Sequence, residues 1–593
     1  MRQVLSVSTA RKFPTWKQWK QLPSVLSLTE QRLGNAGIWM IMLSIATMIF
    51  SFVLTHRVEI PTLGGEYTEG LVGEPQFINP LYATTNDVDA DLSSLVYSGL
   101  LSLSPTQGLI PDLAEEYWTS EDGKTISFRL RENAVFHNGD PVKVQDVLFT
   151  MSAIQNPAYR SPLAPQFKGV TVNQDDDRIV SFVLEKPSST FLNTLTVGIL
   201  PSSVWSEILP QNAPLAALNL QPIGSGPYEF SEFSKDKRGS ILSYTLKANT
   251  DYYNGGAHIE TLNFKFYPDA KEAMDAFNQK FVEGVSVIPF EDIQTVADKK
   301  SVTLHQPYLP DEVVLFFNEK TNAQLKDLSV RTAIAQAIDR NKIAQDVFQG
   351  TVRAIETPLL PGMVGYSADL HAPSFDLNHA NELIGAVKIP EMNVEPKPEA
   401  TEGTGETAEE PAEPTPEPVL ASKKLTFKLT IMDRPEFQAV ATKIQEQLAQ
   451  INIQIEIVAI PADEFANTVI EPRNFELLLG SVYLQANPDL SLFWHSSQIG
   501  ENGLNLSGYQ NKDVDALLEK AQQTTSVEDR ATLLRSIQEQ ILKDVPAVFL
   551  YQSTYPYATP KSIQNVVIDQ INVPQDRFAT IKDWFIKTKK TLK

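Results

Sequence analysis

The stretch LTFKLTIMDRPEFQAVATKIQEQLAQINIQIEI, residues 425–457, carries the clearest structural pattern in the chain. Apolar and polar residues alternate from Leu425 to Ile431 and again from Ile451 to Ile457, which is the period of a β-strand with one buried face. Between these segments the apolar residues follow the spacing of one helix face, at Phe437, Val440, Ala441, Ile444 and Leu448. A strand, a helix of this length and a second strand predict a parallel crossover, and therefore an α/β fold.

The sequence on both sides extends the same pattern. Apolar residues at helical spacing predict one amphipathic helix from Asp327 to Phe348, with Arg331 and Arg340 on its surface as structural ion-pair residues. Ser526 and Asp529 have the spacing of a capping box before another helix. No repeat of solenoid length is visible. We therefore expect a globular α/β ectodomain.

Residues 390–418 interrupt this pattern. They contain nine Glu and seven Pro against a single Lys, and no aromatic residue. Such a segment cannot bury enough apolar surface to offset the entropy lost on ordering. We interpret it as a disordered acidic insertion, and a specific partner for it is the alternative.

A long uncharged segment lies near the N-terminus. Residues 33–55 contain no charged side chain, and about 20 apolar residues cross the hydrocarbon core of a bilayer. Residues 1–32 carry six Lys and Arg against one Glu, which predicts a cytoplasmic arm and an outward-facing remainder. Residues 56–65 are expected to be a short linker. The rival interpretation is a cleaved signal peptide, whose apolar region would be shorter and followed by a small-residue cleavage site.

The composition excludes several classes of function. The formal net charge of −22 over 593 residues argues against a nucleic-acid partner, which would require clustered Lys and Arg. The absence of cysteine excludes disulfides, a thiol nucleophile, cysteine-ligated zinc and iron–sulfur clusters. The chain is therefore expected to hold its fold without covalent or cysteine-bound metal cross-links.

Catalytic and metal-binding motifs are also missing from the sequence. Its seven histidines form no H-E-x-x-H or comparable pair. There is no G-x-S-x-G elbow, and the glycines of residues 222–228 lack the lysine and the spacing of a phosphate-binding loop. We therefore predict a protein that is not an enzyme and has no metal site and no cofactor.

Eight segments, in order, resemble family 5 extracellular solute-binding proteins of ABC importers, the type that binds peptides or nickel. They span about 500 residues, from roughly residue 62 to residue 577, and their order makes the resemblance specific. The most distinctive segments are LVYSGLL at 95–101, PDLAEEYW at 111–118, FHNGDP at 136–141, GSGPY at 224–228, VRTAIAQAIDR at 330–340 and GYQNKDVD at 508–515.

The resemblance implies a periplasmic-binding-protein-like two-lobed fold of type II, similar to the three-domain cluster C proteins, behind the N-terminal transmembrane helix. Lobe I, or domain I, would combine residues 62–86, 185–312 and 546–593. Domain II would be an insertion of residues 87–184. Lobe II, or domain III, would comprise residues 313–545, interrupted by the acidic insertion. The chain would cross between the lobes near 313–318 and 548–551, through two strands.

The resemblance also implies a function. The protein would be a monomer on the cell membrane, anchored by one helix with its N-terminus in the cytoplasm. It would capture an oligopeptide or similar small solute between the lobes by hinge closure and deliver it to an ABC permease. The alternative is a surface receptor or interaction protein that reuses this fold without import.

The segment GSVYLQANPD, residues 480–489, matches the place where peptide-binding members of the family hold the α-ammonium of the ligand with an aspartate. Aligned without gaps, that aspartate falls at Leu484. Three alternatives follow: the ligand lacks a free amino group, another carboxylate replaces the lost one, or the cleft binds nothing. The predicted ligand-binding residues are Tyr483, Leu484, Asn487, Asp489, Trp494, Phe317 and Asn318. Asn487 and Asp489 have a structural alternative as the cap and first turn of a helix.

Overall fold

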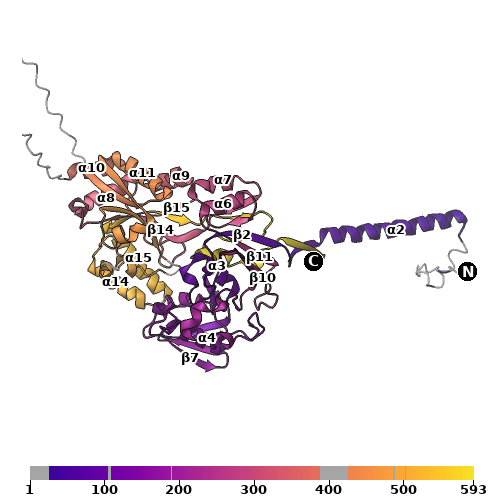
Figure 1. The fold of residues 1–593 in the computed structure, drawn as a ribbon. Coiled ribbons are helices and arrows are strands. Elements are labelled where there is room, and N and C mark those ends of the chain that lie inside the picture. The colour runs from indigo at the N-terminus through magenta and orange to yellow at the C-terminus, as the bar shows by residue number, and fades with distance from the viewer. Residues whose placement is uncertain are drawn as a thin grey trace, which may run out of the picture. The chain divides into compact units, whose positions relative to one another are not determined.

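The computed structural model describes residues 16, 20, 26–104, 108–188, 190–387, 425–484, 488–500 and 503–592. The chain divides into two units, one of residues 1–62 with 587–593 and one of residues 63–586. Figure 1 shows the elements of both units. The predicted insertion 390–418, Asn487 and most of the N-terminal arm lie outside the described residues.

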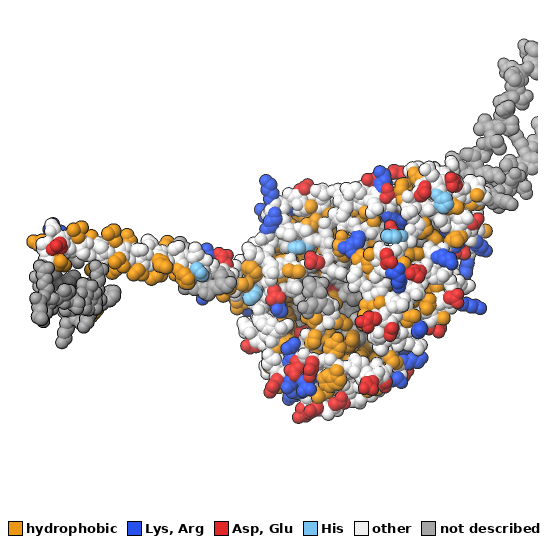
Figure 2. Space-filling view, turned by 180° about the vertical axis from the view of Figure 1, so that it is seen from behind, with side chains coloured by type: hydrophobic (Ala, Val, Ile, Leu, Met, Phe, Trp, Pro, Cys, Tyr) orange, Lys and Arg blue, Asp and Glu red, His pale blue; other side chains and the backbone are white. Residues whose placement is uncertain are grey.

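The first unit contains one long helix and one two-stranded ribbon. Helix α2 (Leu28–Thr55) is the one described helix that is long and apolar enough to cross a membrane, with a mean hydropathy of 2.1 over its most apolar part. Its side chains are mostly hydrophobic along its exposed length (Figure 2). The helix begins before the predicted residue 33, because Ser27 and Glu30 cap it: the Ser27 amide donates to Glu30 Oε2 at 2.9 Å.

Strand β1 (Arg57–Thr62) follows α2 and pairs antiparallel with strand β21 (Lys587–Leu592). The sequence predicted a linker here. No local pattern could have identified this strand, because its partner comes from more than 500 residues further along the chain.

The second unit contains a seven-stranded sheet in the order β13-β20-β12-β2-β11-β10-β9. Strand β2 (Glu66–Val72) runs parallel to both of its neighbours, β11 and β12. The other strands are β9 (Tyr228–Lys235), β10 (Ile241–Ala248), β11 (Thr261–Tyr267), β12 (Gly284–Val285), β13 (Val302–His305) and β20 (Tyr557–Pro560). The helices of this part are α3 (Asp87–Val96), α5 (Ser202–Trp205), α6 (Ala270–Asn278) and α7 (Ile293–Ala297).

An antiparallel four-stranded sheet, in the order β5-β6-β8-β7, shares an apolar core with the seven-stranded sheet. Its elements are β5 (Ala114–Thr119), β6 (Thr125–Leu130), α4 (Val144–Gln155), β7 (Thr171–Asp176) and β8 (Ile179–Val183). The hairpin of β3 (Leu101–Ser104) and β4 (Gly108–Pro111) precedes it.

A six-stranded sheet, in the order β15-β19-β14-β18-β16-β17, forms the rest of the second unit. Its strands are β14 (Tyr308–Phe317), β15 (Arg353–Ala354), β16 (Leu425–Met432), β17 (Ile453–Ile460), β18 (Leu477–Tyr483) and β19 (Ala547–Thr554). Its helices are α8 (Leu328–Ala337), α9 (Arg340–Phe348), α10 (Leu377–Ala386), α11 (Pro435–Ala449), α12 (Ala462–Phe465), α13 (Ser491–Trp494), α14 (Lys512–Gln523) and α15 (Val527–Asp544).

The alternation along β14 explains why this sheet is buried on both faces. Val313, Leu315 and Phe317 belong to one apolar cluster, and Val314 and Phe316 belong to another. The predicted crossover is confirmed, since β16 and β17 pair in parallel on either side of α11. The cap at Ser526 is confirmed as well: its side chain accepts a hydrogen bond from the Asp529 amide.

The single helix predicted from Asp327 to Phe348 is wrong. It is two helices, α8 and α9, because the Asp339 side chain accepts from the Lys342 amide and caps a new helix after an extended Ile338. Arg331 and Arg340 are also not on a surface, since they are only 7% and 6% exposed. Arg331 does form the predicted kind of ion pair, with Glu319 Oε1 at 3.0 Å. It also donates to the carbonyls of Val545 and Asp544, so it ties α8 to the end of α15.

The chain passes between the two large sheets at two adjacent places. Strand β13 leads into β14 through residues 306–307, and β19 leads into β20 through residues 555–556. The Tyr555 amide donates to the Pro307 carbonyl at 2.9 Å, so the two links lie side by side. Both predicted crossing segments, 313–318 and 548–551, lie inside or beside strands of the six-stranded sheet, several residues from the links. The boundaries of the three predicted domains stay predictions.

Candidate functional site

A cavity of about 540 Å³ lies where the six-stranded sheet meets the elements of the other two sheets. Tyr483, at the end of β18, lines it from the six-stranded sheet. Residues between Ser94 and Asp112 and between Asn572 and Asp583 line it from the other side. We call it the inter-sheet cavity. Its volume suits a small ligand, since such pockets usually measure about 300–1,000 Å³.

Tyr483 places a half-exposed phenol among carboxylates. Its side chain is 40% exposed, and its backbone lies opposite Asp311 of β14. Burial, then the charges of Asp576 and Asp311, hold the pKa of Tyr483 well above its ordinary value. The phenol is therefore a neutral hydrogen-bonding group at the edge of an acidic surface.

The opposite wall supplies two partly desolvated carboxylates. Tyr253 donates its hydroxyl hydrogen to Asp112 Oδ1 at 2.5 Å, and burial raises the pKa of Asp112 to about 6. Burial likewise raises the pKa of Asp576 to about 6, although two amides donate to Asp576 Oδ2, from Asn572 at 2.9 Å and from Val573 at 3.1 Å. Both groups are anionic near neutral pH.

The described lining of the cavity contains three carboxylates and one cation. The cation is Lys582, whose Nζ lies 2.8 Å from Asp583 Oδ1, so it is already paired. Arg131 is the cation next to Asp112: its Nε donates to the Asp112 backbone carbonyl at 2.6 Å, and its charge partly opposes the effect of burial on the Asp112 carboxyl group. The cavity is therefore acidic and suits a positively charged group on a ligand.

A buried ion-pair network fixes the segment that carries Asp576. Arg577, in the short helix Pro574–Phe578, is fully buried and contacts Glu69 Oε1 of β2 at 2.9 Å and Asp91 Oδ2 of α3 at 2.5 Å. Tyr67 and Tyr557 donate their hydroxyl hydrogens to Glu69 Oε2 at 2.9 and 2.8 Å. Because Glu69 of β2 and Asp91 of α3 hold Arg577, and Tyr557 of β20 in turn holds Glu69, the position of the neighbouring Asp576 is tightly constrained.

Most of the residues predicted from the sequence lie away from this cavity. Leu484 is 2% exposed and belongs to an apolar cluster. Asp489 Oδ1 accepts from the Ser491 amide at 3.0 Å, and its Oδ2 accepts from Gln522 at 2.7 Å. It lines a smaller cavity, of about 260 Å³, with Pro488 and with residues 186–188 and 190. The helix beside it begins at Ser491, later than the predicted cap at Asn487.

The other predicted residues pack inside the fold. Trp494 is 1% exposed and packs against Phe316 in a tilted arrangement and against Tyr509 and Phe549 edge to face. Phe317 is 1% exposed in the other apolar cluster of the six-stranded sheet. The Asn318 side chain donates to the Arg473 carbonyl and accepts from the Lys320 amide, so it holds a turn. Of the six predicted residues that the structure describes, Tyr483 is the one that lines the inter-sheet cavity, and Asn487 lies outside the described part of the chain.

The sequence did not indicate Asp112 or Asp576. Asp112 lies in the PDLAEEYW segment, which carried the resemblance but no ligand role, and Asp576 lies in an unremarkable stretch near the C-terminus. The cavity joins residues more than 450 positions apart, and no local spacing signals such a contact. The one available signal was the missing carboxylate at Leu484, which raised the question of a replacement.

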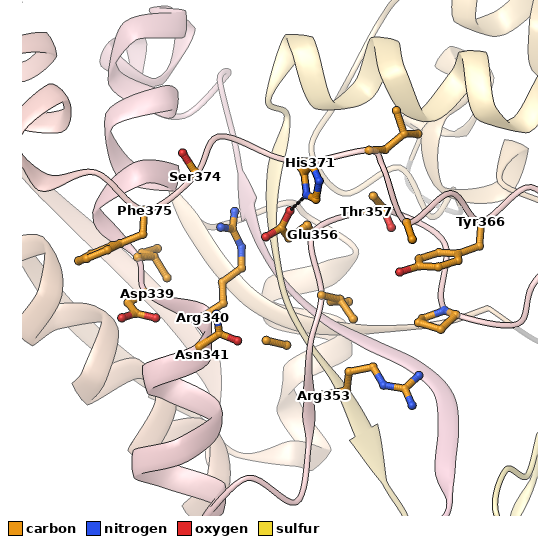
Figure 3. Close-up of a pocket in the computed structure, with 16 residues that line it drawn as sticks. Asp339, Arg340, Asn341, Arg353, Glu356, Thr357, Tyr366, His371, Ser374 and Phe375 are labelled. Carbon is orange, nitrogen blue, oxygen red and sulfur yellow. Dashed lines mark hydrogen bonds and ion pairs between the residues drawn. The ribbon is translucent and has the colours of Figure 1, made fainter.

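A second cavity, of about 390 Å³, lies beside the six-stranded sheet and is lined by residues between Ile338 and Phe375. In Figure 3, Arg340 extends toward Glu356, and His371 Nδ1 lies 2.9 Å from Glu356 Oε2. All of its lining belongs to one continuous segment, so it is not shared between the sheets. Movement of one sheet toward the other would not close this cavity around a ligand, so it is the weaker candidate for the binding site.

The comparisons with known proteins agree with this fold. A family profile described as bacterial extracellular solute-binding proteins, family 5, matches residues 108–502. The oligopeptide-binding protein AppA of Bacillus subtilis is 26% identical over 538 residues, which are 89% of this chain and 93% of that protein. The dipeptide-binding protein of Escherichia coli is 24% identical over 573 residues, 92% of this chain and 98% of that protein.

Solved structures show the same two-lobed architecture. The ABC transporter substrate-binding protein CtaP of Listeria monocytogenes matches with a TM-score of 0.73 at 21% identity, over 88% of this chain and 99% of that one. AppA of Bacillus subtilis in complex with a nonapeptide matches with a TM-score of 0.63 at 24% identity, over 89% of this chain and 100% of that one. The predicted α/β two-lobed fold is confirmed.

Proposed function

Because the chain belongs to the bacterial extracellular solute-binding proteins of family 5, we propose that it captures an oligopeptide or a similar small solute in the inter-sheet cavity. It then delivers the solute to the permease of an ABC importer. The observation that carries this proposal is the acidic cavity between the two large sheets, with Tyr483 on one wall and Asp112 and Asp576 on the other. The relatives named for oligopeptide and dipeptide binding support a peptide as the solute.

The carboxylate of Asp576 takes over the role that an aspartate at Leu484 would have had. Its Oδ2 is occupied by two backbone amides, and in the described chain its Oδ1 has no protein donor. A ligand ammonium at Oδ1 would form a charge-assisted hydrogen bond in a partly desolvated site, where such bonds are strong. The free α-amino group of a peptide is the simplest ligand group with this chemistry.

Capture would proceed by movement of the six-stranded sheet about the links at 306–307 and 555–556. Two short links impose little resistance to a hinge motion, and ligand contacts made only in the closed state would favour closure. The two sides also meet away from the cavity: a Cβ built on Gly123 would lie 3.0 Å from Thr525 Cγ2. These contacts would help hold the closed form.

Helix α2 would anchor the protein in the cell membrane as a single-pass protein with its N-terminus in the cytoplasm. Its length and composition support this role, and the cationic arm before it supports the orientation. Anchoring keeps the binding protein at a high effective concentration near its permease. We propose binding by a monomer, without a cofactor and without catalysis.

The alternative is a surface interaction protein that keeps the fold without importing a solute. The observation in its favour is Leu484, a buried apolar residue at the place of the usual ammonium anchor. This alternative requires an inter-sheet cavity that binds no small molecule.

A thermal-shift screen of the full chain in detergent distinguishes these functions. The pools are free-amino peptides, the same peptides N-acetylated, and sugars. A ligand at about 100 times its Kd stabilises the native state by about 2.7 kcal/mol, which raises the melting temperature visibly. A shift with free-amino peptides is the expected result. No shift with any pool would contradict solute capture and favour the interaction protein.

A further inference from the structure

Strands β1 and β21 form a two-stranded ribbon beside the predicted membrane anchor, and we call residues 57–62 with 587–592 the terminal ribbon. Its six residue pairs run from Arg57 opposite Leu592 to Thr62 opposite Lys587. The two strands are separated by more than 500 residues of chain. Pairing therefore brings the end of the chain back to the segment that follows α2.

The terminal ribbon is strongly basic, in contrast to the rest of the protein. It carries four cations, Arg57, Lys587, Lys589 and Lys590, and one carboxylate, Glu59, which gives a net charge of +3. The whole chain has a net charge of −22. All five side chains are exposed. Lys590 Nζ lies 3.3 Å from Glu59 Oε1, and in the described chain no acidic side chain pairs with the other three cations.

Chain connectivity keeps these charges close to the end of α2. The helix has 28 residues, about 42 Å at 1.5 Å per residue, whereas the hydrocarbon core is about 30 Å thick. The helix ends at Thr55, and Arg57 opens the ribbon. Lys590 and Lys589 lie opposite Glu59 and Ile60, only about 7–10 Å further along the strand. That distance is comparable to the Debye length of about 8 Å at physiological ionic strength.

The composition of the ribbon favours a lipid surface over a protein partner. Three of its four cations are lysines, which are depleted at the cores of protein interfaces, and it has no aromatic residue. Lysine ammonium groups act as point charges, which suit a diffuse layer of phosphate better than a shaped protein pocket. The cations lie on both faces of the ribbon. Successive residues of a strand point to opposite faces, so Lys589 and Lys590 lie on different faces, and each shares its face with the residue paired opposite it.

We propose that the terminal ribbon binds anionic phospholipid headgroups of the outer leaflet. The ribbon thus makes a second, electrostatic attachment to the membrane beside the one made by α2. The two ends of the second unit, at residues 63–65 and at Ile586, are also adjacent to each other. A Cβ built on Gly65 would lie 3.1 Å from Ile586 Cβ. A ribbon held at the headgroups would therefore restrain both ends of the second unit at once. This inference rests on the proposed membrane anchor.

The absence of cysteine makes a site-specific test simple. The full chain with Thr588→Cys, labelled with a fluorophore, is reconstituted into nanodiscs of phosphatidylcholine or of phosphatidylcholine with phosphatidylglycerol. Spin-labelled headgroups quench the fluorophore when it is near the surface. We expect at least about twofold stronger quenching in the anionic discs, with the difference lost near 1 M salt, where the Debye length falls to about 3 Å.

Two lysine-to-glutamine variants provide the comparison. Lys587→Gln/Lys589→Gln/Lys590→Gln should abolish the difference between the discs. Lys237→Gln/Lys271→Gln/Lys300→Gln, which removes the same charge from exposed sites of the second unit, should leave it unchanged. Equal quenching in both discs would overturn the proposal, and so would cross-linking of position 588 to a protein in native membranes. Alkaline extraction of the membranes tests the anchor separately. A protein that resists extraction has α2 inserted, and a protein that is extracted would show that the proposed anchor is wrong.

Discussion

Two neighbouring residues, Asp576 and Arg577, have different roles in the proposed site, one toward the ligand and one toward the fold. Arg577 points into the core, where it meets Glu69 and Asp91, and Asp576 points to the cavity. Burial raises the pKa of Asp91 to about 6, although Arg577 opposes this shift. The guanidinium of Arg577 is the cationic partner of both buried carboxyl groups, Glu69 and Asp91.

Replacement of Arg577 by Met should therefore destabilise the fold strongly. Removing one partner from a buried pair leaves an uncompensated charge and costs about 3–5 kcal/mol. Chemical denaturation of the single variant measures this loss. The triple variant Arg577→Met/Glu69→Gln/Asp91→Asn, which also removes both charges, should recover much of it. A single variant as stable as the wild type would refute the structural role of Arg577.

The buried aspartates predict opposite effects of pH on folding and on binding. The pKa of Asp112 and of Asp576 is raised to about 6, above its ordinary value of 3.8. Between these values the folded state binds more protons than the unfolded state, so the unfolding free energy falls as pH rises through this window. A ligand ammonium needs the carboxylate of Asp576, so its affinity should be lost as pH falls through about 6.

For a pKa of about 6, the ionised fraction of Asp576 is about tenfold smaller at about pH 5 than at about pH 7, so the Kd should rise about tenfold. Calorimetric titration at both pH values tests the predicted loss of affinity at low pH. Denaturation of the ligand-free protein at the same pH values tests the predicted rise in its unfolding free energy. An affinity that does not change with pH would exclude Asp576 as the ammonium anchor.

At the scale of elements, the predictable parts of the fold were those with a complete local pattern. The β16–α11–β17 crossover could be predicted because period-two and helical spacings follow one another within 36 residues. The break between α8 and α9 was missed, since the apolar stripe continues across Asp339 and only its capping bond reveals the boundary. The β1–β21 ribbon was missed because its two strands are separated by more than 500 residues of chain.

The contact of the GSGPY segment with α3 is an element-scale feature that the structure explains. A Cβ on Gly224 would lie 2.0 Å from the Val96 carbonyl oxygen, which is backbone and cannot move aside. Gly224→Ala should therefore lower the unfolding free energy by more than about 2 kcal/mol, at the level of an overpacked core site.

Gly385→Ala is the matched control, because Gly385 lies in α10 with open space around it. Alanine in a helix should raise the unfolding free energy by about 0.5–1 kcal/mol. Urea denaturation of the two variants and the wild type would measure both changes in unfolding free energy. A neutral Gly224→Ala would show that the segment does not pack against α3 in the folded protein.

At the scale of the whole molecule, the two-lobed fold could be predicted from motifs in order, but the site could not. Its walls come mainly from residues within 94–104, 109–112 and 572–583 and from Tyr483, which meet only in the folded chain. Two residues predicted near Tyr483 in the sequence, Leu484 and Trp494, lie in the apolar core instead. Tyr483 is thus the described residue that the sequence prediction shares with the cavity, and the ligand role of the predicted residues stays a prediction.

The central claim is that Asp576 holds the amino group of a captured peptide, and calorimetric titration of the full chain in detergent tests it most directly. The wild type, Asp576→Asn and Asp177→Asn, an exposed control, are titrated with a free-amino peptide selected by thermal shift and with its N-acetylated form. A charge-assisted hydrogen bond of about 1.5–3 kcal/mol predicts that the wild type and Asp177→Asn prefer the free-amino form by at least about tenfold. Asp576→Asn should lose that preference while remaining folded, as a cooperative melting transition would show. An unchanged preference in Asp576→Asn, or no binding of any free-amino peptide to the wild type, would contradict the account.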